Sequence, residues 1–164
     1  MKLPIAITLG DPAGIGPEII AKAFRDAHDA VRGCFVAGDV GTLRRAAATL
    51  QGDSQVSLPV AEIDTPAAAL TAPPRCIPVL QVVPRAEPVA LGQVSAAAGK
   101  IAGDCVFWAA RAALAGEVSA IVTAPLHKEA LAAAGAPYAL YPGHTELLQA
   151  VAAEHLGVPV AELP

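Results

Sequence analysis

Residues 5–18 read Ile-Ala-Ile-Thr-Leu-Gly-Asp-Pro-Ala-Gly-Ile-Gly-Pro-Glu, an apolar run followed at once by a loop rich in glycine and proline. The apolar run predicts a buried strand. Pro17 suits the first position of a helix because its φ is already helical, and Glu18 places a carboxylate where the helix dipole favours it. The segment therefore predicts a strand, a glycine loop and a helix, the order with which α/β proteins bring backbone N–H groups to phosphates and dinucleotides.

The glycines of this loop, Gly10, Gly14 and Gly16, do not have the spacing of the dinucleotide-binding fingerprint G-x-G-x-x-G. A tight strand-to-helix turn that needs a positive φ at two positions is the simple alternative. Asp11 is compatible with two roles, because it either braces the loop by accepting N–H bonds or faces a cleft. The loop thus indicates the class of fold and leaves its ligand open.

The composition is that of one soluble domain with a substantial core, since 54% of the 164 residues are hydrophobic. The sequence offers no membrane-spanning run and no signal peptide at Met1–Pro4, so we expect a cytoplasmic protein without a membrane partner. A net charge of −4, scattered basic residues and only 4% aromatic residues argue against a nucleic-acid partner. Cys34, Cys76 and Cys105 are widely spaced, which predicts buried free thiols.

Strand and helix patterns alternate along the rest of the chain. We expect further strands at 33–38, 56–60, 78–83 and 118–124, and an irregular surface connection at 65–74. We expect a helix that follows Asp39 as its N-cap and runs through Leu43 to Leu50, and further helices at 93–115, 128–134 and 146–156. Such alternation predicts an α/β fold with a mainly parallel sheet covered by helices on both faces. Neither a repeat nor a flexible linker divides the chain.

Residues 123–129 read Thr-Ala-Pro-Leu-His-Lys-Glu and begin at the carboxyl end of the predicted strand 118–124. Open α/β sheets bind their ligands at this end of the strands. His127 and Lys128 offer a hydrogen-bond donor, a cation for an anionic substrate, or a group that transfers a proton. A solvated first helical turn accounts for the same residues equally well.

Residues 141–146 read Tyr-Pro-Gly-His-Thr-Glu and precede the last predicted helix. We expect Thr145 to cap this helix and His144 to lie at its N-terminus, a favourable place for an anion. Imidazole, hydroxyl and free N–H groups together suit a phosphorylated or carboxylated small molecule, and a plain capping turn is the alternative. His28 and His155 are expected at the surface.

These motifs resemble the 4-hydroxythreonine-4-phosphate dehydrogenase family, which is related to the isocitrate and isopropylmalate dehydrogenases. The resemblance is carried by GDPAGIGPE at 10–18, APLHKE at 124–129 and GHTE at 143–146, and the segment 92–100 is also similar. It implies the isocitrate/isopropylmalate dehydrogenase-like fold. Because members of the family are considerably longer, it also implies that 1–164 is the N-terminal half of a two-domain dehydrogenase.

The resemblance implies an NAD(P)- and metal-dependent oxidation of the secondary alcohol of 4-phosphohydroxy-L-threonine. The product loses CO2, a step in the biosynthesis of pyridoxal 5'-phosphate. Related members act on other four-carbon sugar-acid phosphates, such as threonate or erythronate 4-phosphate, so this activity stays open. A non-catalytic truncated fragment and an unrelated phosphate-binding α/β module are further alternatives.

The family's substrate-binding pair corresponds to His144 and Thr145, with His127 as a further candidate. Lys128 is the candidate for proton transfer or for holding an anion. The expected glycine loop near the cleft contains Asp11, Gly14 and Gly16. These assignments require the turns around Gly14, Lys128 and His144 to meet at one edge of the sheet.

The resemblance further implies NAD or NADP as cofactor and a divalent metal, Zn, Mg or Co. The metal ligands of the family lie downstream of the GHTE element, so we expect no metal ligand in this chain. A small phosphorylated substrate and a second copy of the chain in a homodimer are the expected partners.

Overall fold

The computed structural model describes residues 2–50, 58–85 and 87–163. Its strands form a single parallel sheet in the order β3-β4-β2-β1-β5. They are β1 (Ile5–Thr8), β2 (Cys34–Gly38), β3 (Val60–Ile63), β4 (Ile77–Gln81) and β5 (Ala120–Thr123). The described parts of the connections between strands contain helical segments, as parallel pairing requires.

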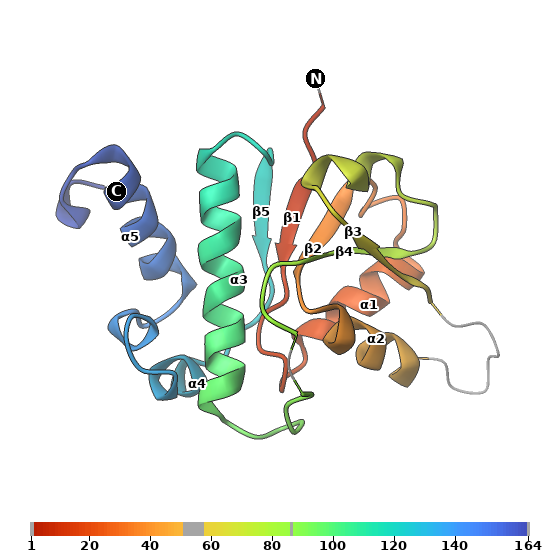
Figure 1. Ribbon diagram of the computed structural model, residues 1–164, viewed down its shortest axis with the longest axis horizontal. Helices are drawn as coiled ribbons and strands as arrows, with labels where there is room; N and C mark the ends of the chain where they lie inside the picture. Colours follow the sequence, from red (N-terminus) through yellow and green to blue (C-terminus); the bar gives the residue numbers. More distant parts are fainter. Residues whose placement is uncertain (1, 51–57, 86, 164) are drawn as a thin grey trace.

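Helices cover both faces of this sheet (Figure 1). Helices α1 (Gly16–Asp26) and α2 (Val40–Thr49) lie on one face, and the long helix α3 (Ala96–Leu114) lies on the other. Two further helices, α4 (Lys128–Ala133) and α5 (His144–Leu156), pack against α3. The expected α/β class, with a parallel sheet between two helical layers, is confirmed.

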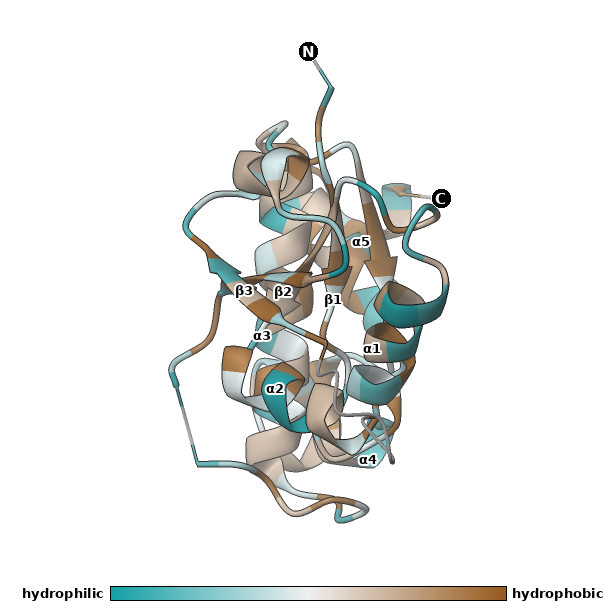
Figure 2. Cartoon of the chain, turned by 90° about the vertical axis from the view of Figure 1, so that its right-hand side faces the viewer, coloured by the Kyte–Doolittle hydropathy of each residue, from teal (hydrophilic) through white to brown (hydrophobic). Residues whose placement is uncertain are grey.

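The strands divide their side chains between two cores because successive residues point to opposite faces. Ile7 and Val36 pack with α1 and α2, whereas Phe35 and Ala37 pack with α3. On the α3 side, the Phe35 ring meets Trp108 edge to face, with 6.0 Å between the ring centroids. Figure 2 shows the result, with largely apolar strands at the centre and polar residues on the outer turns of α1.

Helix α3 begins at Ala96, so the predicted start at residue 93 is wrong. Ser95 has an extended backbone, and its hydroxyl accepts a hydrogen bond from Ala98 N at 3.1 Å, which caps the helix. Val94 precedes this cap and is exposed. Val94 therefore lies outside the helix in spite of its helical spacing, because the N-cap residue Ser95, rather than the apolar periodicity, fixes where α3 begins.

Other element boundaries also shift. Strand β3 covers 60–63 instead of 56–60, and Val56 lies outside the described residues. The connection at 65–74 contains the 3-10 helix η1 (Pro66–Thr71), and further 3-10 turns are η2 (Tyr138–Leu140) and η3 (Val160–Glu162). Proline fixes a helical φ near the start of η1, which explains the turn in an otherwise irregular segment.

The three cysteines are buried and free, as expected. Burial raises the pKa of all three thiols, and that of Cys105 reaches about 12. His28 and His155 are exposed, also as expected. Across the described ranges, every helix is too short or too polar to cross a membrane.

Candidate active site at the carboxyl edge of the sheet

The glycine loop and the loop after β5 lie in backbone contact. Strands β1 and β5 are neighbours with Thr8 opposite Thr123, so both loops start side by side. Asp11 N donates to Pro125 O at 2.9 Å. A Cβ on Gly10, whose φ is +72°, would lie only 2.4 Å from the same oxygen. This close approach therefore requires glycine at position 10.

Asp11 braces the glycine loop from inside. Its side chain is 7% exposed, and Oδ1 accepts a hydrogen bond from Ala13 N at 2.9 Å. Gly14 N donates to the backbone carbonyl of Asp11 at 3.0 Å. The N–H groups of residues 11, 13 and 14 thus already have acceptors within the protein. The loop is therefore held by its own aspartate, and these N–H groups are not free to bind a phosphate.

A hollow of about 360 Å³ opens beside the exposed side of this loop. Gly14 and Ile15 line it together with Arg45 of α2 and Leu91. The Arg45 guanidinium donates to Pro12 O at 3.0 Å and to Val89 O at 2.7 Å, which ties the loop to the segment before α3. Sequence reasoning missed Arg45, because nothing in the sequence distinguishes it from a surface residue of an ordinary helix.

Lys128 is the first residue of α4, and its side chain is exposed, as is that of His127. Buried Ala130 and Leu131 hold α4 against α3. The contact is very close, since a Cβ on Gly99 would lie 1.8 Å from Ala130 O. The position of Lys128 therefore depends on the absence of a side chain at Gly99.

The third motif lies next to the second. Gly143 is the N-cap of α5, and a Cβ built on it would be 3.8 Å from Lys128 Cε and 3.4 Å from Glu146 Oε2. His144 is half-buried and Thr145 is exposed. Thr145 lies inside the first helical turn, so its predicted capping role is wrong: the extended residue before the helix is Gly143, which has no side chain to cap with.

A polar cluster on α3 braces the turn between these two motifs. The Tyr138 hydroxyl donates to Asp104 Oδ1, and Lys100 Nζ donates to Asp104 Oδ2 at 2.7 Å and to the Tyr138 oxygen at 3.2 Å. The hydrogen bond to Asp104 raises the pKa of Lys100, and burial raises the pKa of Tyr138. A Cβ on Gly103 would lie 2.3 Å from the Tyr138 ring, so this glycine makes room for the tyrosine.

The three motifs thus lie next to one another in a row. The glycine loop contacts the loop after β5 at Pro125, and the Lys128 side chain lies near Gly143 at the start of α5. Gly14 itself faces the hollow next to α2, which neither Lys128 nor His144 lines. The chemistry of an anion site is concentrated at Lys128 and the start of α5. There the Lys128 side chain approaches the N-terminus of α5, whose first residue is His144, and the Glu146 carboxylate lies beside it.

The described residues do not fit a metal ion. Within 2–50, 58–85 and 87–163, no three His, Cys, Asp or Glu side chains come close enough together to hold one.

Comparison with known proteins places this arrangement in a family. The family described as pyridoxal phosphate biosynthetic protein PdxA matches residues 30–160. The chain is 48% identical over 152 residues to a D-threonate 4-phosphate dehydrogenase of Pectobacterium atrosepticum, a match that covers 90% of this chain and 44% of that protein. It is 41% identical over 159 residues to a 4-hydroxythreonine-4-phosphate dehydrogenase of Beijerinckia indica, a match that covers 96% of this chain and 44% of that protein.

Solved structures agree. The chain superposes on 4-hydroxythreonine-4-phosphate dehydrogenase from Klebsiella pneumoniae with a TM-score of 0.79 and 41% identity, covering 92% of this chain and 44% of that one. It spans less than half the length of the curated relatives that it matches. The parallel sheet, the three linked motifs and the family match over most of the residues together show that the chain belongs to the PdxA family.

Proposed function

We propose that this chain is part of an NAD(P)- and metal-dependent dehydrogenase that oxidises the secondary alcohol of a four-carbon hydroxy acid carrying a terminal phosphate. The observation that carries the proposal is the approach of Lys128 to Gly143, the N-cap of α5. Lys128 Cε would lie 3.8 Å from a Cβ built on Gly143. This approach supports a site in which the Lys128 ammonium group and the N-terminus of α5, where His144 is the first residue, act on the same anion. Relatives of the chain are named as dehydrogenases of such phosphates, which supports the same substrate class.

In this proposal the chain's own residues bind and orient the substrate. Lys128 and the N-terminus of α5 attract an anionic group of the substrate, and His144 and Thr145 donate hydrogen bonds to it. Lys128 alternatively moves a proton to or from the reacting oxygen, and His127, at the N-cap of α4, is the further polar contact. When bound, NAD or NADP accepts the hydride, and the ligands of the Zn, Mg or Co ion are contributed by residues outside this chain.

Two substrates of this class are the main candidates. The first is 4-phosphohydroxy-L-threonine, whose oxidation product loses CO2 on the route to pyridoxal 5'-phosphate. The second is D-threonate 4-phosphate, and it is favoured by the higher identity, 48% and 46%, to relatives named for that compound. Erythronate 4-phosphate is a further member of the same class. The first two differ in the group next to the carboxylate, an ammonium in one and a hydroxyl in the other, so one assay separates them.

We further propose that residues 1–164 form the N-terminal half of a two-domain dehydrogenase that works as a homodimer. The support is that relatives matched over about 90% of this chain are covered over only 44% of their own length. Val122 on β5 and Ile15 and Ile19 around the start of α1 are large apolar side chains that are 50%, 65% and 46% exposed. Such residues suit burial against a second domain or subunit.

The test has two parts. First, the chain alone is titrated with each phosphate, and the ring resonances of His144 are followed by NMR; we expect shifts that Lys128→Ala abolishes and Lys22→Ala, an exposed lysine on α1, leaves intact. Second, residues 1–164 replace the matching part of the Pectobacterium atrosepticum enzyme. NAD(P)H formation by this chimera is then measured with each substrate and metal.

Turnover of D-threonate 4-phosphate or 4-phosphohydroxy-L-threonine by the chimera supports the proposal, and the preferred compound names the substrate. A folded chimera that reduces neither NAD nor NADP would contradict it and favour a non-catalytic role. Shifts of His144 that survive Lys128→Ala would remove Lys128 from the anion site while leaving the dehydrogenase assignment to the activity assay.

A further inference from the structure

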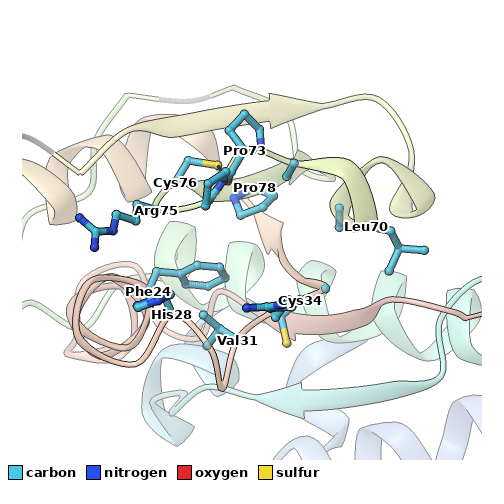
Figure 3. Close-up of a pocket in the computed structure, with 14 residues that line it drawn as sticks. Phe24, His28, Val31, Cys34, Leu70, Pro73, Arg75, Cys76 and Pro78 are labelled. Carbon is cyan, nitrogen blue, oxygen red and sulfur yellow. Dashed lines mark hydrogen bonds between the residues drawn. The ribbon is translucent and has the colours of Figure 1, made fainter.

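A second hollow lies at the amino end of the sheet, where β2 begins at Cys34 and β4 begins at Ile77 (Figure 3). It has a volume of about 350 Å³ and opens between the end of α1 and the segment 69–78. Because the strands are parallel, this hollow and the candidate active site lie at opposite ends of the sheet. Nothing in the proposed dehydrogenase function uses it.

The walls of this hollow are mainly apolar. Figure 3 shows Phe24 and Val31 on one side, facing Pro73, Cys76 and Pro78 on the other. Its volume is at the small end of the range for sites that bind small molecules. The hollow therefore has room for a compact apolar group of a ligand.

The hollow has basic side chains on its lining. His28, Arg32 and Arg75 line it, and none of its described lining residues is acidic. The Arg32 guanidinium is already paired with Asp29 at 2.7 Å, and His28 Nε2 is 3.7 Å from the same carboxylate group. Within the part of the chain that the structure describes, Arg75 forms no salt bridge. Arg75 is exposed at one edge of the hollow, where Figure 3 shows its side chain extending outward, so its guanidinium is the cation available to an anion at the rim.

The backbone at Arg75 supports a role for this side chain. Its φ is +60°, a left-handed conformation that glycine or asparagine adopts more easily than arginine. The neighbouring Cys76 Sγ lies 3.0 Å from Pro73 O, which helps close the same turn. The chain therefore carries a basic side chain at a position where glycine would relieve the backbone, and strained positions of this kind occur preferentially at binding sites.

We infer that this hollow binds a small organic carboxylate, with its apolar body between Phe24 and Pro78 and its carboxylate at Arg75. A guanidinium pairs with a planar carboxylate through two parallel hydrogen bonds, which favours Arg75 over the paired Arg32. The inference does not depend on the proposed dehydrogenase function, because no residue is shared between the two sites.

Benzoate is a suitable probe because it combines a compact ring with one carboxylate. The 164-residue chain is titrated with benzoate and, separately, with benzyl alcohol, while the methyl resonances of Val31 and Leu70 are followed by NMR. We expect saturable shifts with benzoate and at least tenfold weaker binding of the neutral alcohol. Equal affinity for the two compounds, or shifts confined to residues around Lys128 and His144, would overturn the inference.

Arg75→Gly is the decisive variant, since it removes the guanidinium and relaxes the backbone, so the fold is retained. We expect its affinity for benzoate to fall about tenfold, the loss of one charge-assisted contact at a partly exposed site. Arg75→Lys keeps the charge and should retain part of the affinity. Arg44→Gln, an equal change of charge at an exposed position of α2, and His144→Ala at the other site should have no effect on benzoate binding. Undiminished binding of benzoate by Arg75→Gly refutes the assignment.

Discussion

Gly99 is the position where one methyl group should have the largest effect on the candidate site. In Gly99→Ala the new Cβ would lie 1.8 Å from Ala130 O and 2.8 Å from Leu131 N, whereas contacts under 3.0 Å essentially do not occur. Both neighbours are backbone atoms of α4, so no side-chain rotation relieves the clash. Helix α4 must move away from α3 by about 1 Å, and Lys128 at its first residue must move with it.

The size of the effect follows from two opposing terms. Overpacking a close contact costs about 1–3 kcal/mol, and a rigid backbone neighbour places this case near the upper value. Alanine in the interior of a helix is about 1 kcal/mol more favourable than glycine, which offsets part of that cost. We therefore expect the free energy of unfolding to fall by about 2 kcal/mol and the Tm to fall by about 4–8 °C.

Thermal and urea unfolding followed by circular dichroism measure this change directly. The matched control is Gly41→Ala at an exposed position of α2, where the new Cβ would be 3.1 Å from Asp39 Oδ2 and 4.0 Å from Asp39 Cγ. That oxygen also caps α2 by accepting from Thr42 N, so its small shift weakens the cap, and the better helix propensity of alanine offsets this loss; the control should be within about 1 kcal/mol of the parent. A Gly99→Ala protein as stable as the control would refute the close α3–α4 contact on which the site geometry depends.

Three further predictions concern the loop, the core and the site. Asp11→Ala leaves the buried Ala13 N–H without its acceptor and should lower the free energy of unfolding by about 1–3 kcal/mol in urea, whereas Asp11→Asn retains an acceptor oxygen and should lose less. Burial raises the pKa of Cys105 from 9.0 to about 12, so the neutral thiol stabilises the folded protein fully below pH 9.0, and this stabilisation is lost as the pH rises towards 12. Between these pH values the free energy of unfolding should fall with pH less steeply in Cys105→Ala than in the parent, by about 1.4 kcal/mol per pH unit. An unchanged pH slope would contradict this. In the chimeric enzyme, His144→Ala should lower kcat/KM by roughly tenfold to a thousandfold, and unchanged kinetics would exclude His144 from the site.

Local sequence patterns predicted the strand, glycine loop and helix of residues 5–24, and the structure has β1 and α1 there. Predictions were weaker where an element depends on a cap or on its neighbours. The start of α3 was misplaced because Ser95 caps the helix after an apolar Val94. The N-cap of α5 was assigned to Thr145, although a glycine with extended backbone takes that position.

In the candidate site, too, local motifs could be predicted from the sequence and long-range contacts could not. The sequence identified Lys128, His144 and the glycine loop, because each motif is a short, continuous pattern that requires no knowledge of its neighbours. It did not identify Arg45, whose two carbonyl acceptors, Pro12 and Val89, are 33 and 44 residues away. Such a contact leaves no local pattern.

By itself, the sequence determined the class of fold, the buried thiols and the three motifs, because periodicity, glycine placement and hydrophobicity act within a few residues. Only the tertiary structure decided that Asp11 turns inward, that Gly14 faces a hollow that Lys128 does not line, and that Gly99 allows α4 to approach α3. These outcomes depend on which distant backbones come within van der Waals distance. That is a property of the packed chain, and no stretch of neighbouring residues encodes it alone.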